Sequence, residues 1–144
     1  MTALRMVSLG FLSVMVAACS SVAPVKVAAG DQCFRCRRSI NNVLVAGESI
    51  DSKNFVSKYR GPGCMAKYLV AHPDEKAQSV LYVTDYATGK MIAPTRALYV
   101  PEIVDRNTGE ADYRAYHEKA DADAAAAELH TTPIGWDAVL DKAR

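Results

Sequence analysis

The hydrophobic and polar positions divide the chain into a short apolar leader and a longer region of apolar runs separated by polar turns. Residues 6–18 carry no charge and are dominated by Leu, Val, Met and Phe. A helix that crosses a bilayer needs about 20 apolar residues, whereas a signal-peptide core needs only about 7–15. These 13 residues therefore predict a signal peptide rather than a membrane span.

The first half of the region that follows is predicted to fold in the order strand, strand, helix, strand. Runs rich in Val, Ile, Tyr and Leu predict strands at 42–50, 55–59 and 79–86. Between the second and third runs, Gly61-Pro62-Gly63 breaks the chain, and residues 64–71 carry apolar side chains at i, i+3 and i+4. That spacing predicts a helix with one buried face.

The second half is predicted to repeat this order. Strands are expected at 97–100, with a start as early as residue 91, and at 111–117, followed by an alanine-rich helix at 119–130. Residues 132–140 are expected to hold a closing strand or turn and a last short helix. The pattern predicts an α+β fold of two ββαβ-type units, with antiparallel sheets and helices to one side.

Four cysteines change this picture, and the first of them marks the end of the leader. Cys19 follows Val16-Ala17-Ala18, a pattern typical of bacterial lipoproteins, in which a lipid is attached before cleavage makes the cysteine the new N-terminus. We therefore expect a lipoprotein signal peptide at 1–18, a lipid-anchored flexible tether at 19–30 and a domain at 31–144. The alternative is an ordinary signal peptide, cleaved at the same place, with an unmodified cysteine.

The leader also predicts where the protein resides and what it does not bind. Ser20 rather than Asp after Cys19 favours the outer membrane of a bacterial cell envelope, with the domain facing the periplasm and the membrane held through the lipid. A formal net charge of +1 gives no electrostatic basis for nucleic-acid binding. The sequence contains no nucleophile elbow, Gly-rich phosphate loop or paired-acid motif, so we expect a protein that is not an enzyme.

The remaining three cysteines predict a site for a soft metal ion. An odd number of thiols in an exported protein leaves one thiol free, paired between chains or bound to metal. Two residues separate Cys33 from Cys36, so both sulfurs are able to reach one ion from a tight turn. Cys64 is expected in the first turn of a helix, where the helix dipole favours a thiolate. Three thiolates suit Cu(I), or Zn(II) with a fourth ligand.

Residues beside the cysteines add to this prediction. The positive charges of Arg35, Arg37 and Arg38 are expected to favour thiolate over thiol at Cys33 and Cys36. Met65 is a candidate thioether ligand next to Cys64, although its helical spacing with Tyr68 and Leu69 is more typical of a core residue.

Other interpretations of the thiols stay open at this point. Cys33 and Cys36 are able to form a small disulfide in an oxidising compartment, and Cys64 also fits a buried apolar position. A thiol–disulfide oxidoreductase would use Cys33 as nucleophile and Cys36 as resolving thiol, although the pair does not lie between a strand and a helix. A structural zinc knuckle would hold the N-terminal turn against the helix start at Cys64.

Four blocks of the sequence follow one another in a specific order. They are Cys33-x-x-Cys36, Gly63-Cys64-Met65-x-x-Tyr68-Leu69, Tyr82-Val83-Thr84-Asp85-Tyr86-x-Thr88-Gly89 and Ala97-Leu98-Tyr99-Val100. In this order, and behind a lipoprotein leader, the blocks resemble the NosL family of nitrous oxide reductase accessory lipoproteins. Two positions depart from the family pattern: Arg38 stands where members commonly carry a methionine, and Thr108-Gly109 stands where many carry Met-Gly.

The resemblance implies a fold and a function. Its fold consists of two related ββαβ units, in agreement with the element order above. Its function is that of a non-enzymatic, periplasm-facing lipoprotein that binds Cu(I) and delivers it to a copper-accepting protein, either nitrous oxide reductase or one of its assembly factors. Residue by residue, Cys33 and Cys36 match the CxxC of the family, and Cys64 with Met65 matches its Gly-Cys-Met block.

Overall fold

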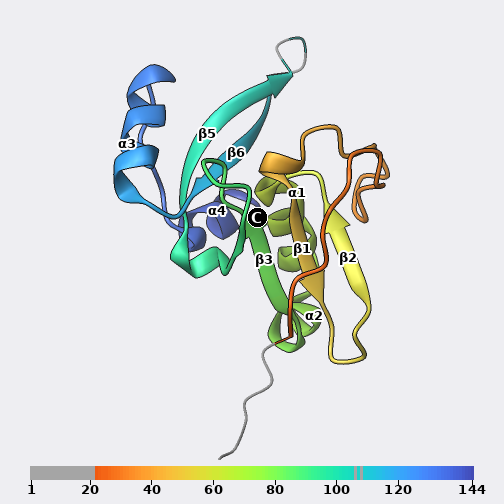
Figure 1. The fold of residues 1–144 in the computed structure, drawn as a ribbon. Coiled ribbons are helices and arrows are strands. Elements are labelled where there is room, and N and C mark those ends of the chain that lie inside the picture. Colours follow the sequence, from red (N-terminus) through yellow and green to blue (C-terminus); the bar gives the residue numbers. More distant parts are fainter. Residues whose placement is uncertain (1–21, 106, 108) are drawn as a thin grey trace, which may run out of the picture.

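Two antiparallel sheets form the framework of the computed structural model, which describes residues 22–105, 107 and 109–144 (Figure 1). The first sheet has four strands in the order β2-β1-β3-β4, and the second is the hairpin β5-β6. In chain order the elements are the 3₁₀ helix η1 (Val43–Val45), β1 (Gly47–Ile50), β2 (Val56–Tyr59), α1 (Pro62–Ala71), α2 (Pro73–Gln78), β3 (Val80–Thr84), β4 (Met91–Ile92), the 3₁₀ helix η2 (Pro94–Arg96), β5 (Leu98–Asp105), β6 (Glu110–Tyr116), α3 (Lys119–Glu128) and α4 (Trp136–Lys142).

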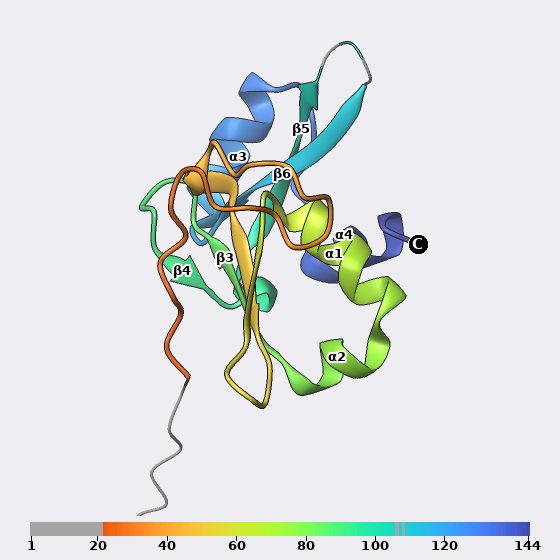
Figure 2. The ribbon, with the colours of Figure 1, turned by 90° about the vertical axis from the view of Figure 1, so that its right-hand side faces the viewer.

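The central strand β1 is buried along its whole length because both faces of its sheet are covered. One face packs on helix α1, and the core between them includes Tyr59, Met65 and Val83, none of which is exposed to solvent. Residues 22–27 cover the other face, where the backbone N–H of Val25 donates to Glu48 at 2.7 Å. The views in Figure 1 and Figure 2 show this segment running along the sheet on the side away from α1.

The second half of the chain repeats the pairing of the first with a shorter closing strand. Helix α3 packs its small alanines against Val100 and Tyr116 of the β5-β6 hairpin. After α3, Ile134 pairs with Tyr99 of β5 in an antiparallel bridge, and the two residues exchange N–H···O=C bonds of 2.8 and 2.9 Å. The order β6-β5-Ile134 therefore corresponds to β2-β1-β3, which confirms the predicted α+β class with antiparallel sheets.

The structure differs from the predicted elements at three places, each for a local reason. The strand predicted at 42–50 begins with the 3₁₀ helix η1, because the side chain of Asn42 accepts the N–H of Leu44 and turns the chain. Helix α1 ends at Ala71 as predicted, but Pro73 opens a second helix that was not predicted, since proline tolerates the first helical position. Strand β5 runs past its predicted end through Pro101, which a two-stranded sheet accepts on an edge.

Residues 22–30 are the described part of the predicted tether, and they lie against the domain. Val27 is buried in the main core, and Lys58 of β2 donates to the carbonyl of Lys26 at 3.2 Å. The predicted signal peptide and Cys19 lie outside the described residues, so the division of the chain into leader, tether and domain stays a prediction. Among the described residues, no helix has both the length and the apolar character that a membrane span requires.

Glu48 is a buried carboxyl at the centre of the first sheet. Its Oε1 accepts the N–H of Val25, while its Oε2 has no hydrogen-bond partner. Burial raises the pKa of Glu48 above its ordinary value of 4.5. A raised folded-state pKa stabilises the protein below the unfolded-state pKa, and this contribution is lost as the pH rises through the folded-state value.

Glu48→Gln is therefore expected to raise the free energy of unfolding at pH 8 by about 1–3 kcal/mol, because it removes a buried charge and keeps the oxygen that Val25 uses. The gain should shrink toward pH 4, where the wild-type carboxyl is protonated in both states. Urea unfolding at the two pH values measures it. Glu128→Gln, at an exposed site in α3, is the control and should change stability by less than about 1 kcal/mol. A loss of stability at pH 8 would contradict the prediction.

Candidate metal centre

Backbone hydrogen bonds hold Cys33 and Cys36 in a tight loop. The N–H of Cys33 donates to the carbonyl of Arg38, and the N–H of Arg37 donates to the carbonyl of Cys33, both at 2.9 Å. Arg37 has a φ of 62°, in the left-handed region, which lets the chain reverse after Cys36. The N–H of Phe34 donates to the carbonyl of Lys58 at 2.7 Å and fixes the loop on the end of β2.

Cys64 is placed by the start of helix α1, and a residue from the other half of the chain holds that start. The N-cap residue Gly61 has no side chain with which to accept a backbone N–H. Instead, Asp112 of β6 accepts the N–H of Gly63 at 2.8 Å and that of Tyr113 at 2.9 Å. The carboxylate of Asp112 therefore caps the N-terminus of α1 from a different element.

The two glycines make this contact possible through their size. A Cβ on Gly61 would overlap the carboxylate of Asp112, and one on Gly63 would lie 3.0 Å from its Oδ1. The φ of Gly61 is −170°, an extended value that other residues also adopt. Glycine is thus needed here because β6 approaches the helix closely.

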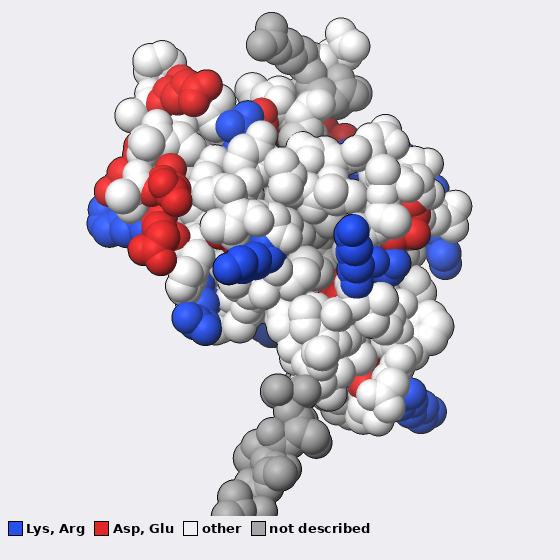
Figure 3. Space-filling view, viewed as in Figure 1, with Lys and Arg blue, Asp and Glu red and all other residues white. Residues whose placement is uncertain are grey.

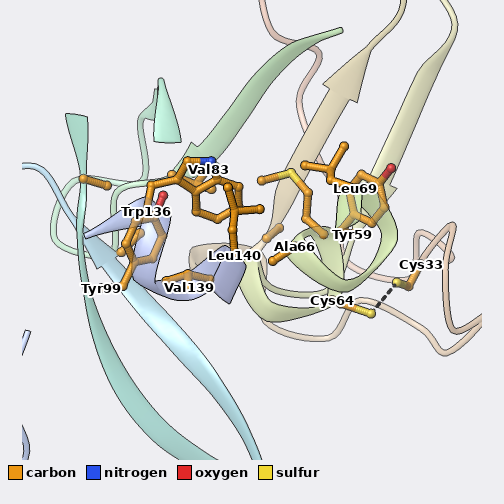
Figure 4. Close-up of a cluster of buried hydrophobic side chains, with 14 of the residues drawn as sticks. Cys33, Tyr59, Cys64, Ala66, Leu69, Val83, Tyr99, Trp136, Val139 and Leu140 are labelled. Atoms are coloured by element: carbon orange, nitrogen blue, oxygen red, sulfur yellow. Dashed lines mark hydrogen bonds between the residues drawn. The ribbon is translucent and has the colours of Figure 1, made fainter. Parts of the chain in front are cut away.

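The three sulfur atoms converge where the loop meets the helix. The Sγ atoms of Cys33, Cys36 and Cys64 all lie within 4.8 Å of one another, and those of Cys33 and Cys64 are 3.5 Å apart. Figure 4 shows the latter pair at one end of the main core, with Cys64 on the first turn of α1. Three sulfurs bound to one ion at about 2.3 Å would be about 4.0 Å apart, so the observed spacing is close to that of a three-sulfur site.

The three thiols differ in burial and in proton affinity. Cys33 is 0 % exposed and Cys64 is 7 % exposed, whereas Cys36 is partly exposed. The thiol of Cys64 donates to Cys33, and this bond lowers the pKa of Cys33, with further help from the N–H groups of Cys36 and Arg60. The same bond and burial raise the pKa of Cys64. The pair therefore gives up a first proton readily and retains the second.

Two arginines from different elements lie next to Cys36. Arg38 forms a two-point ion pair with Glu110 of β6, at 3.0 and 3.1 Å, and Arg60 pairs with the same carboxylate. A contact with Cys36 adds to the effect of Glu110 in raising the pKa of Arg38. Of the three arginines predicted to act on the thiols, only Arg38 is placed to do so. Arg35 and Arg37 instead line a neighbouring groove.

The structure thus brings together the three thiols that the sequence singled out, each as a free cysteine. Met65 lies elsewhere: its side chain is fully buried, and a Cβ on Gly47 of β1 would be 3.3 Å from its Sδ. Its role as a ligand stays a prediction, and its position matches the alternative of a core residue. Thr108 lies outside the described residues.

The residues that hold the loop and the helix in place were not apparent from the sequence. Arg60 follows Cys36 by 24 residues, and Glu110 and Asp112 come from β6 of the second sheet. No local pattern links them to the thiols. The only available signal was Asp112 itself, a charged residue within a predicted strand, which indicates either an exposed position or a special role.

Gly61→Ala is expected to lower the free energy of unfolding by about 1–3 kcal/mol or more, because the added methyl group displaces the capping carboxylate of Asp112. Urea unfolding measures the change. Gly135→Ala is the matched control, since Gly135 is also a helix N-cap with a negative φ and has open space around it. That variant should lower the free energy of unfolding by less than about 1 kcal/mol. An equal loss of stability in the two variants would show that the contact between Asp112 and the helix start does not require glycine at position 61.

Comparison with known proteins shows a relationship in structure. No family model matches the chain, and no curated protein matches it. Among solved structures, the crystal structure of the copper chaperone NosL from Shewanella denitrificans is similar, with a TM-score of 0.60 and 20% sequence identity. The likeness covers 79% of this chain and 96% of that protein. It shows a shared fold, and this is the fold of the family that the four sequence blocks resemble.

Proposed function

We propose that this protein is a non-enzymatic carrier of Cu(I), which binds the ion as cargo through the thiolates of Cys33, Cys36 and Cys64 and passes it to another protein. The observation that carries the proposal is the convergence of three sulfur atoms within 4.8 Å from two separate elements. Thiolates are soft ligands, and a site built only of sulfur favours Cu(I) among the available metal ions. The shared fold with a copper chaperone supports the same assignment.

The composition of the site favours Cu(I) over a structural zinc ion. Zinc in a structural site takes four ligands in a tetrahedron. Within the part of the chain that the structure describes, no His, Asp or Glu joins the three cysteines in a cluster. Three sulfurs from a turn and a helix start are sufficient for Cu(I), which accepts low coordination numbers, and they leave zinc one ligand short.

Burial of the thiols argues against a thiol–disulfide oxidoreductase. Such an enzyme needs an exposed nucleophile that attacks the disulfide of a second protein. Cys33, the nucleophile in that alternative, is 0 % exposed, and its sulfur lies 3.5 Å from that of Cys64, outside the CxxC pair. An attacking partner would have to open the core before it reached Cys33.

The location and the recipient of the copper follow from the sequence. A lipid on Cys19 would hold the domain at the outer membrane, facing the periplasm, where copper enzymes of the cell envelope receive their metal. The recipient is a copper-accepting protein, and the resemblance of the four blocks to the NosL family points to nitrous oxide reductase or one of its assembly factors. Each of these statements is part of the proposal.

Cu(I) titration of the reduced protein should give one ion per chain. Replacement of a cysteine by serine removes a soft ligand, so Cys33→Ser, Cys36→Ser and Cys64→Ser should each weaken the affinity for Cu(I) about 100-fold or more. Competition with a chromophoric Cu(I) chelator under anaerobic conditions measures the affinity. An absence of high-affinity uptake by the wild type would eliminate the proposed function.

Met65→Leu is the matched control for these variants, because it keeps the side-chain volume and removes only the thioether. The affinity for Cu(I) should stay within about threefold of the wild type if Met65 fills the core. Loss of affinity in this variant alone, with all three serine variants near the wild type, would replace the three-thiolate site with one that depends on the thioether.

The affinity for Cu(I) should also rise with pH across the neutral range. The raised pKa of Cys64 keeps one proton on the Cys33–Cys64 pair, and the metal must displace it. Each proton released per ion bound makes the apparent affinity increase about tenfold per pH unit. The competition titration repeated at pH 6, 7 and 8 measures the slope. A flat profile would mean that both thiols are already ionised in the metal-free protein.

A further inference from the structure

A shallow groove of about 430 Å³ lies beside the cysteine loop and is lined mainly by cations and aromatic rings. The loop contributes Phe34, Arg35 and Arg37, and helix α1 with its C-cap contributes Lys67, Tyr68 and His72. No carboxylate lines the groove. It is therefore a basic surface that is continuous with the loop that carries Cys33 and Cys36.

The cations of this groove lack the carboxylate partners that several other cations of the protein have. Arg38, Lys58, Arg60 and Arg114 each form an ion pair with a carboxylate. By contrast, Arg35, Arg37 and Lys67 are exposed and form no ion pair with any residue that the structure describes. Unpaired charges of one sign that gather on one surface raise the local concentration of ligands of the opposite sign.

The floor of the groove is aromatic and rigid. The ring of Phe34 meets that of Tyr68 edge to face at 5.2 Å, and Tyr68 stacks on His72 at 4.1 Å. Phe55 of the turn before β2 extends this surface, with its ring 6.0 Å from Phe34 and its side chain mostly exposed. Exposed aromatic side chains surrounded by charges are typical of protein-binding surfaces.

One carboxylate, that of Glu75, accepts the hydroxyl of Tyr68 at 2.6 Å at the edge of the groove, and other exposed acidic side chains lie elsewhere. Figure 3 shows them gathered over helix α3, which carries Asp121, Asp123 and Glu128. In Figure 1, α3 and the cysteine loop lie on opposite sides of the molecule. The acids of α3 therefore do not cancel the charge of the groove, because charges farther apart than about 10 Å are screened at moderate salt. The carboxylate of Glu75 offsets only part of the charge of Arg35, Arg37 and Lys67.

We propose that this groove is the docking site for the acidic surface of the protein that accepts the copper. This inference rests on the proposed function and adds to it the charge of the acceptor and the place where it binds. Charge complementarity selects the occupant, since Arg35, Arg37 and Lys67 are unpaired and face outward. An acceptor seated there touches the loop on both sides of Cys36, which is the one sulfur of the three that is partly exposed.

Docking at this position also determines the order of transfer. A thiolate or thioether sulfur of the acceptor first adds to Cu(I), and the Cu–S bond to Cys36 then breaks. The copper stays in its +1 state and no electron moves. The Cys36 thiolate that leaves takes up a proton from water, and Cys33 and Cys64 follow in the same way as further acceptor sulfurs add.

The test uses two synthetic acceptor peptides with the same Met-x-x-Met-x-x-Met copper-binding sequence, flanked either by four aspartates or by four lysines. Stopped-flow measurement of Cu(I) transfer from the loaded protein should give a rate constant about tenfold higher for the acidic peptide at about 20 mM ionic strength. The difference should disappear at about 0.5 M salt, where charges are screened within a few Å.

Arg35→Glu/Lys67→Glu should abolish the preference for the acidic peptide. Arg37 is kept because its guanidinium packs over Phe34 and its backbone is left-handed. The matched control is Lys53→Glu/Lys90→Glu, which makes the same change in net charge at two exposed sites outside the groove and should retain the preference. An equal loss in both double variants, or no preference in the wild type, would overturn the docking site.

Two further measurements separate this inference from the proposed function and from other occupants. Binding of the acidic peptide to the metal-free protein, followed by NMR shifts of groove residues, does not depend on copper and still tests the groove if the protein takes up no Cu(I). Sedimentation tests for a second copy of the chain, whose α3 is acidic. The assignment to an acceptor would be overturned if the wild type self-associates, only the groove variant loses this self-association, and the acidic peptide does not bind.

Discussion

The geometry of the sulfur site depends on one hydrogen bond between the two halves of the chain, from the N–H of Gly63 to the carboxylate of Asp112. The bond satisfies a free donor at the start of α1 and fixes the first turn of the helix against β6. Cys64 is the next residue, so its sulfur is positioned by the second sheet. Arg38 and Glu110 connect the cysteine loop to the same strand, and the second half of the protein therefore holds both parts of the site together.

The unequal burial of the three thiols suits a carrier better than a permanent metal site. Two of the sulfurs, those of Cys33 and Cys64, are enclosed at the end of the main core and would keep water from a bound ion. The third, on Cys36, is partly exposed and lies in a loop flanked by unpaired cations. In the proposed carrier, retention and release of the copper would thus be divided between different residues, because a buried sulfur exchanges slowly and an exposed one is open to an incoming ligand.

Much of the fold was predictable from the sequence because its elements follow local rules. The alternation of apolar residues gave the strands and the helical spacing gave α1, while the element order gave the two related units. Errors occurred where a side chain or a proline acts over one turn, as at Asn42 and Pro73. The last strand of the second unit was ambiguous in the sequence because it consists of one bridging residue, Ile134, with too few residues to produce a pattern.

The sequence by itself determined which atoms are available for a metal ion: two thiols in one short turn and a third after a Gly-Pro-Gly break. Only the tertiary structure decided that Cys64 faces Cys33 and that Met65 points into the core, because these directions depend on the rotation of α1 about its axis. Asp112 sets that rotation from 49 positions along the chain. A contact over this separation leaves no periodic signal in the sequence, since it is produced when the two halves pack together.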